Sequence, residues 1–321
     1  MEAMKRAASP SSDAANKRRY HSQDDTEARA VAEHYNARPE VGREKRKESK
    51  IIRLKSFNNW IKSVLIGRYI ARGDYVLDMG CGKGGDLLKM VKARIAELVG
   101  ADIASISIEQ AQDRYNGLRN PPFRARFLAL DCYSYPLAPH LPDSYTVDVV
   151  TMQFCMHYAF ETEEKARMML QNVSHTLRDG GYFIGTIPNA NWIVKKVRDQ
   201  KSRGQETAFG NDIYWITFEE EDTKEFPSYG AKYMFHLEDA VDCPEYLVHF
   251  PTFTSLAKEY NLELEYKQTF HQLYQEAAQE SHFNNLLYRM NVVGGHGQAL
   301  SEAEWEAAGL YLAFAFRKRR P

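Results

Sequence analysis

The sequence has few cysteines, no long apolar segment and almost no net charge. Its cysteines, Cys81, Cys132, Cys155 and Cys243, are scattered and form no CxxC pair. This spacing argues against a zinc site and against a disulfide framework, and it favours a reducing compartment. No run of 18 apolar residues occurs, so we expect no segment that spans a membrane. The first 20 residues contain no apolar stretch and give no indication of a secretory signal.

The charges nearly balance, with 42 basic and 43 acidic residues, but they are unevenly distributed. Residues 40–62 hold eight Lys and Arg against three Glu, whereas residues 219–245 hold nine acids against two Lys. The overall charge does not predict nucleic-acid binding. A basic band on a neutral protein indicates either a phosphate-rich ligand held at one place or an ordinary solvated helix face.

The chain divides into a short tail and one long folded unit. Residues 1–26 are rich in Ser, Ala, Asp and basic residues without a hydrophobic period, which predicts a disordered basic tail. Lys5-Arg6 and Lys17-Arg18-Arg19 are separated by ten residues, the spacing of a bipartite nuclear-import signal. We therefore expect a nuclear protein whose folded unit covers residues 27–321.

Strands and helices alternate through the first half of this unit. Buried strands are expected at residues 75–79, 97–102, 126–131, 147–153 and 182–186. Helices are expected at residues 51–69, 86–94, 106–115 and 165–177, the last with Gly180-Gly181 as its C-cap. This alternation predicts an α/β protein with a doubly wound, mostly parallel sheet and helices on both faces. Beyond residue 205 a strand-rich insertion follows, and residues 304–316 pass from a helix into a strand.

A glycine-rich loop directly follows the first strand. Gly80, Gly82 and Gly85 satisfy the dinucleotide pattern GxGxxG, so NAD has to be considered. Asp102, at the end of the second strand, can accept hydrogen bonds from ribose hydroxyls. Because NAD and S-adenosylmethionine (AdoMet) both carry a ribose, Asp102 does not discriminate between them.

Two further acids favour AdoMet. Asp78 precedes the glycines, where a carboxylate suits a cationic sulfonium and amino group but would repel a pyrophosphate. Asp131 ends the third expected strand, where an adenine amino group would lie. Gln153 ends the fourth strand and His157 and Tyr158 follow it, and ligands of such sheets bind outside the carboxyl ends of the strands. The loop therefore predicts an AdoMet site.

Several blocks of the chain together resemble the eukaryotic mRNA cap guanine-N7 methyltransferases. The blocks are residues 57–66 (FNNWIKSVLI), 76–89 (VLDMGCGKGGDLLK), 153–158 (QFCMHY), 180–189 (GGYFIGTIPN), 209–211, 241–245, 250–251 and 305–316. The resemblance covers nearly all of the chain after residue 30. It implies a Rossmann-like class I AdoMet-dependent methyltransferase fold, and residues 27–321 as the catalytic domain. Met79 and Ile187 are conservative departures, and residues 284–303 do not align.

The resemblance also implies roles for individual residues. The residues implied to hold AdoMet are Lys62, Gly80, Asp102, Asp131, Gln153 and Tyr158. The residues implied to face the cap are Asn58, Asn59, Lys83, Lys89, Arg114, His157, Glu245 and Tyr311. Lys83, Lys89 and Arg114 can meet a triphosphate. His157 and Glu245 can bond the guanine edge, and Phe57 and Tyr311 offer aromatic surfaces.

The implied reaction is transfer of the AdoMet methyl group to N7 of the cap guanine. N7 carries a free lone pair and no proton, so an in-line displacement needs no general base and no metal. His157, Glu245 and Tyr311 are then positioning groups. The implied partners are the capped 5′ end of mRNA and, as open alternatives, the capping guanylyltransferase or RNA polymerase II; no membrane partner is expected. The competing hypotheses are a catalytically idle cap-binding module and a methyltransferase for another base or a small molecule.

Overall fold

The computed structural model describes residues 31–34, 36–37, 48–204, 207–219, 225–293 and 300–320. The predicted tail, residues 1–26, lies outside these ranges. Within them, every helix is too short or too polar to cross a membrane.

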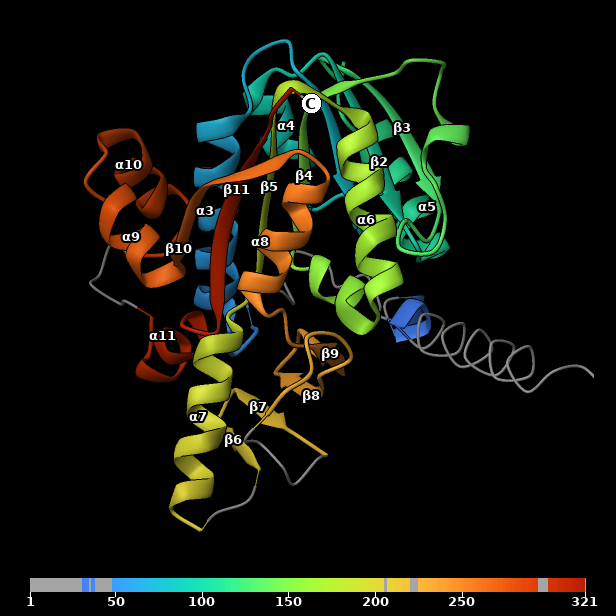
Figure 1. Cartoon of the computed structure of the whole chain (residues 1–321). Coiled ribbons are helices and arrows are strands. Elements are labelled where there is room, and N and C mark those ends of the chain that lie inside the picture. The colour runs from blue at the N-terminus through green and yellow to red at the C-terminus, as the bar shows by residue number, and fades with distance from the viewer. Residues whose placement is uncertain are drawn as a thin grey trace, which may run out of the picture.

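A seven-stranded sheet forms the centre of the molecule (Figure 1). Across the sheet its strands are β10 (Leu262–Thr269), β11 (Tyr311–Lys318), β5 (Leu177–Pro188), β4 (Val147–Gln153), β1 (Tyr75–Met79), β2 (Glu97–Asp102) and β3 (Arg124–Ala129). Strands β1 to β5 pair in parallel, whereas β11 is antiparallel to both of its neighbours. The mostly parallel sheet is therefore confirmed. Its strand order reverses between β1 and β4, which is where ligands of such sheets bind.

Helices cover both faces of this sheet. One face packs against α3 (Ile52–Tyr69), α4 (Leu87–Ala93), α9 (Phe270–Ala277), α10 (Ser281–Arg289) and α11 (Glu302–Ala308). The other packs against α6 (Glu163–Thr176) and α8 (Phe250–Glu259), which lie in front of the strands in Figure 1. Helix α5 (Ser105–Asn116) and the short 3-10 helices η1 (Ala138–His140) and η2 (Met156–Glu161) complete this part. Alternate residues of the buried strands enter the two cores, because side chains of a strand point to opposite faces.

The strand-rich insertion is a four-stranded antiparallel sheet beside one helix. Helix α7 (Ala190–Ser202) is followed by β6 (Ala208–Gly210), β7 (Tyr214–Thr217), β8 (Lys232–Leu237) and β9 (Val241–Tyr246), which pair in chain order. This small sheet and α7 lie together at the lower end of Figure 1, where the parallel strands also end.

The glycine pair after α6 does not cap that helix. Helix α6 ends at Thr176, and Gly180-Gly181 lies inside β5, where the pairing with β4 shifts register between Val147 and Val149. Gly180 has φ 76°, and a Cβ on Gly181 would lie 2.7 Å from the Asp148 carbonyl oxygen. The expected C-cap is therefore wrong: these glycines accommodate an irregularity in the strand.

Two helices next to the strand ends are capped by distant side chains. The N-cap residue of α3 is Ile51 and that of α5 is Ala104, and neither can cap with its side chain. Instead, Glu304 Oε1 accepts the Leu54 N–H at 3.0 Å. Asn36 Oδ1 accepts the Ile106 N–H at 3.2 Å in the same way. These contacts supply the acceptors that first-turn N–H groups need.

Candidate active site

A cavity of about 240 Å³ opens at the carboxyl ends of the parallel strands. Its lining comes from the loops after β1, β2, β3 and β4, and from β9 of the small sheet. Among the lining residues are Gly80, Gly82, Asp102, Ile103, Ser107, Asp131, Tyr133, Gln153, Phe154, Tyr158, Pro244 and Tyr246. Five of the residues predicted to hold AdoMet, Gly80, Asp102, Asp131, Gln153 and Tyr158, line this one cavity.

The glycines leave room that side chains would fill. Gly80 has φ 77°, and a Cβ there would lie 2.5 Å from Cys155 Sγ. Gly82 has φ 50°, and its N–H donates to Asp102 Oδ2 at 2.8 Å. Positive φ and close backbone approach both require glycine. The loop is thereby folded back onto the end of β2, with its backbone at the cavity wall.

Two of the acids predicted to hold AdoMet line the cavity. Asp102 Oδ1 also accepts the Ala104 N–H at 2.9 Å. Burial raises the pKa of Asp102, and its two backbone hydrogen bonds partly offset this rise. Asp131 lies two residues beyond the end of β3, and its Oδ1 accepts the Tyr133 N–H at 2.9 Å. Both carboxylates are thus fixed by backbone donors next to the space they line.

Behind the glycine loop, one buried carboxylate holds two lysines. Asp86 is 7% exposed and lies 2.9 Å from Lys62 Nζ and 2.6 Å from Lys89 Nζ. Burial alone would raise the pKa of Asp86, but the two ammonium groups outweigh it and lower the pKa to about 2. For Lys89, burial disfavours the charged ammonium group and therefore lowers the pKa. The Lys89 Nζ also donates to Asn59 Oδ1 at 3.0 Å. Lys62 is thus placed at this ion pair and not in the cavity lining.

Asp78 is the acid in front of the glycines, and it is 5% exposed. Burial, with the negative charges of Asp86 and Asp102, raises the pKa of Asp78 to about 8. A carboxyl group with such a pKa is stabilised in its ionised form by an added cation. This is the electrostatic setting expected for a cationic ligand.

His157 and Glu245, both predicted to face the cap, form a buried pair. His157 Nε2 lies 3.3 Å from Glu245 Oε1, without hydrogen-bond geometry, and the Tyr233 hydroxyl donates to Glu245 Oε2 at 2.7 Å. His157 adjoins Tyr158, and Glu245 lies between Pro244 and Tyr246. All three of these neighbours line the cavity. The pair thus lies next to lining residues, although neither His157 nor Glu245 lines the cavity itself.

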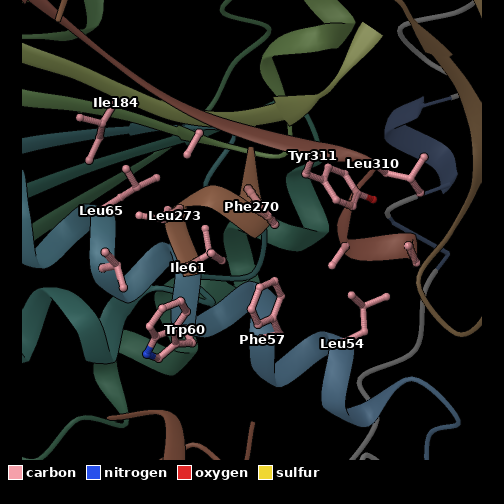
Figure 2. Close-up of a cluster of buried hydrophobic side chains, with 14 of the residues drawn as sticks. Leu54, Phe57, Trp60, Ile61, Leu65, Ile184, Phe270, Leu273, Leu310 and Tyr311 are labelled. Atoms are coloured by element: carbon pink, nitrogen blue, oxygen red, sulfur yellow. The ribbon is translucent and has the colours of Figure 1, made fainter. Parts of the chain in front are cut away.

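The two aromatic residues predicted to face the cap differ in position. Phe57 is fully buried, and Figure 2 shows it within the core between Trp60, Leu54 and Tyr311. The expectation that Phe57 offers a surface to a nucleoside is therefore wrong: it points from α3 into the core. The Tyr311 ring is 5% exposed and packs edge-on against the Phe154 ring, with the centroids 5.0 Å apart.

The other residues predicted to face the cap lie around the glycine loop. Asn58 is half-buried on α3, and its Oδ1 is buried without a hydrogen-bond partner among the described residues. Lys83 follows Gly82 and is half-buried, as is Arg114 in the last turn of α5.

The basic band is described only in part, because residues 40–47 lie outside the described ranges. Lys50 pairs with Glu238 at 3.1 Å, and Lys55 donates to the Asp239 carbonyl oxygen at 3.2 Å. These two lysines thus meet the acidic stretch of the small sheet.

Three parts of the cavity are not predicted by the sequence analysis. Phe154 lines it with φ 60°, a strained conformation for an aromatic residue, held by hydrogen bonds from its N–H to the Thr186 carbonyl and hydroxyl oxygens. Glu161 and Lys165 line its outer part as a 2.5 Å ion pair. Val31, from the N-terminal segment, also lines it. The positive φ of Phe154 cannot be predicted from its residue type. The positions of Glu161, Lys165 and Val31 at the cavity depend on tertiary folding.

Over the described ranges, no group of three or more His, Cys, Asp and Glu side chains is arranged to hold a metal ion.

Comparison with known proteins identifies a family. Residues 18–319 match the family described as the mRNA (guanine-N(7))-methyltransferase domain. The chain is 53% identical over 296 residues to an mRNA cap guanine-N(7) methyltransferase of Cryptococcus neoformans, covering 90% of this chain and 47% of the relative. It is 48% identical over 312 residues to mRNA cap guanine-N(7) methyltransferase 1 of Oryza sativa subsp. japonica, covering 93% of this chain and 84% of the relative. The chain thus spans about half the length of the Cryptococcus relative.

Among solved structures, the CcbJ methyltransferase from Streptomyces caelestis matches with a TM-score of 0.50 at 12% identity. That match covers 82% of this chain and 90% of CcbJ. At this identity the likeness concerns the fold alone, which is that of an AdoMet-dependent methyltransferase of the doubly wound type.

Proposed function

Because the chain belongs to the mRNA (guanine-N7)-methyltransferase family, we propose that it methylates N7 of the guanine cap of mRNA with AdoMet as methyl donor. The observation that carries this proposal is the single cavity lined by Gly80, Asp102 and Asp131. The His157–Glu245 pair adjoins Tyr158, Pro244 and Tyr246 in the lining of the same cavity.

The residues present fit AdoMet. The glycine loop leaves backbone space, Asp102 and Asp131 offer acceptors for hydroxyl and amino groups, and the raised pKa of Asp78 favours a cationic group nearby. Gln153 and Tyr158 line the same cavity as Asp102 and Asp131. Lys62 would reach the carboxylate of the cofactor from its ion pair with Asp86. When bound, AdoMet supplies an electrophilic methyl group on a positively charged sulfur.

The cap would be held by groups on the other side of the cavity. Glu245 can accept hydrogen bonds from the Watson–Crick edge of guanine, and His157 lies beside it. Lys83, Lys89 and Arg114 would attract the triphosphate, with Asn58 and Asn59 donating hydrogen bonds nearby. Tyr311 is itself buried and would border the nucleoside through its contact with Phe154, which lines the cavity.

The chemistry requires positioning and charge stabilisation. Guanine N7 has a lone pair at neutral pH, so no side chain has to remove a proton. The work of the chain is to hold N7 in line with the methyl group. The carboxylate of Glu245 can in addition stabilise the positive charge that develops on the purine ring.

The test is methyl transfer from radiolabelled AdoMet to GpppRNA, with nuclease digestion to identify the product. We expect 7-methylguanosine at the cap and none on uncapped RNA. Binding of GpppRNA without transfer would support an idle cap-binding module instead. Transfer that GpppG does not compete for would support another substrate.

We further propose that the protein acts in the nucleus. The support is the bipartite arrangement of Lys5-Arg6 and Lys17-Arg18-Arg19, which lies outside the described residues. A fluorescent fusion should concentrate in nuclei, and the same fusion with these five basic residues changed to Ala should not. Nuclear accumulation of both would reject this signal.

A further inference from the structure

One helix that leaves the site carries a basic face that the methyl transfer does not use. Helix α7 begins at Ala190, directly after β5. The preceding Asn189 N–H donates to the Leu310 carbonyl oxygen at 2.7 Å, next to Tyr311 at the start of β11. The helix therefore starts at the carboxyl edge of the sheet, beside the proposed cap pocket, and extends away from it (Figure 1).

The exposed side of α7 is polar and basic. Asn191, Lys195, Arg198 and Ser202 are exposed and recur at i, i+4, i+7 and i+11, which places them on one face of the helix. Lys201 is exposed at the edge of this face. The opposite face packs into the core through Ile193 and Val197, which fixes the direction of the basic side.

The charge of this helix contrasts with that of the whole chain. Residues 190–203 contain five Lys and Arg and one acid, in a protein whose net charge is −1. Lys196 is engaged with Glu306 at 2.6 Å, but it lies on the inner side of the helix. Lys195, Arg198 and Lys201 are exposed along about 9 Å of this helix, with the exposed Asp199 beside Arg198.

Acidic residues also occur near the cavity, on the small sheet that lies together with α7. Strand β9 lines the cavity through Pro244 and Tyr246, and the turn before it carries Glu238 and Asp239. Asp242, on β9 itself, has a side chain that is 72% exposed. Lys50 and Lys55 contact Glu238 and Asp239, so a polyanion that leaves the site would be attracted chiefly to the exposed cations of α7.

We propose that Lys195, Arg198 and Lys201 bind phosphates of the single-stranded RNA that follows the cap. This inference rests on the proposed function, because capped RNA is the polyanion that would leave this edge. Positively charged grooves that follow the backbone are the usual means of holding single strands without sequence preference. The α7 face would then lower KM for long transcripts without touching the reacting guanine.

The test compares two substrates and two variants. The variant K195Q/R198Q/K201Q removes the α7 cations. The control R72Q/K92Q/R119Q removes three exposed cations at the amino ends of β1, β2 and β3, on the opposite edge of the sheet. Each protein is assayed on GpppG and on a capped RNA of about 20 nucleotides, long enough to extend past the cap.

We expect the α7 variant to raise KM for the capped RNA about tenfold, with KM for GpppG unchanged. The slope of log KM against log salt concentration should become shallower by about two. Each phosphate contact with a single strand contributes about 0.7 to this slope, and the variant removes three. The control variant should behave as wild type on both substrates. Retained activity on GpppG also shows that the variant is folded.

Three results would overturn the inference in distinguishable ways. A wild type that methylates neither substrate would remove the proposed function itself. Equal KM changes for GpppG and capped RNA, or equal effects of the two triple variants, would remove only the RNA surface. Inhibition of the wild type by polyglutamate but not by uncapped RNA would assign the α7 face to an acidic protein instead.

Discussion

Burial and neighbouring negative charges destabilise the ionised form of the Asp78 carboxyl group. Its pKa is raised from 3.8 to about 8, so between these values the folded chain holds a proton that the unfolded chain has lost. The stability contributed by this proton is full below about pH 4 and disappears as the pH rises through 8. At higher pH the protein retains a buried charge at a cost in folding free energy.

Replacement of Asp78 by Asn should therefore stabilise the fold and weaken the cofactor site. At pH 8 we expect unfolding to require about 1–2 kcal/mol more than in wild type, which calorimetry would detect as a higher Tm. The difference should vanish near pH 4. AdoMet affinity should fall, because the attraction to a cation is lost. An unchanged Kd for AdoMet would show that Asp78 does not act on the ligand.

Asp102 should contribute directly to cofactor affinity. We expect Asp102→Ala to raise the AdoMet Kd at least tenfold, since a hydrogen bond to a charged group contributes roughly 1.5–3 kcal/mol. Isothermal titration measures this change. Asp74→Ala is a matched control, because Asp74 also accepts a backbone N–H, from Ala71 at 2.7 Å, at the opposite edge of the sheet. Equal affinities for the two variants would exclude Asp102 from the cofactor site.

Glu245 should read the guanine base. Guanine presents N1–H and an N2 amine side by side, and a bidentate carboxylate contact discriminates by roughly 1–3 kcal/mol. An inosine cap lacks the N2 amine, so wild type should lose about five- to 150-fold in kcat/KM on it. The Glu245→Gln variant should have a lower kcat/KM than wild type on the guanosine cap. Its kcat/KM should decrease little further on the inosine cap.

The control for this cycle is Tyr233→Phe, which removes the 2.7 Å hydrogen bond to Glu245 but leaves the carboxylate in place. It should keep the discrimination between guanosine and inosine. If the losses caused by Glu245→Gln and by the inosine cap are strictly additive, the carboxylate does not touch the base edge.

At the scale of elements, the predicted strands fit the structure best where they are buried and bounded by glycine or aspartate. The predicted bounds of β1, β2 and β4 agree with the structure residue by residue. Strand β9 was not predicted individually, because Asp242, Pro244 and Glu245 are unfavourable in strands and only pairing with β8 determines their conformation.

The helix caps show why the site was only partly predictable. Ile51 and Ala104 offer no capping signal, and their substitutes, Glu304 and Asn36, lie far away in sequence. The glycine loop and its acids are local signals and could be predicted. The pairing of Lys62 with Asp86 and the burial of Phe57 depend on how α3 packs, which no local pattern specifies.

Glu304→Ala should destabilise α3. The Leu54 N–H would lose its acceptor inside the protein, at a cost of about 2 kcal/mol, so Tm should fall by about 4 °C or more. Because α3 carries Asn58, Asn59 and Lys62, AdoMet binding should weaken as well. Glu302→Ala changes an exposed residue in the same helical turn and should leave Tm unchanged. Equal Tm values for Glu304→Ala and Glu302→Ala would contradict the capping role of Glu304.

At the scale of the whole molecule, the tail and the N-terminal segment should differ in importance. Removal of residues 1–26 should leave kcat/KM on short capped RNA unchanged. Removal of residues 1–37 should raise KM for AdoMet about fivefold or more, because it removes Val31 from the cavity wall and Asn36 from α5. The single variant Asn36→Ala should show an intermediate effect. Full activity after removal of residues 1–37 would exclude this role.

The position of β11 has a consequence for how the protein is made. This strand lies between β5 and β10, yet β5 ends at Pro188 and β11 begins at Tyr311. At roughly 5–20 residues per second, a ribosome needs about 6–25 s to cover that interval. During this time β5 has an open edge, which can pair with other nascent chains. Chaperone binding to the growing polypeptide should therefore be strongest between synthesis of β5 and release of β11.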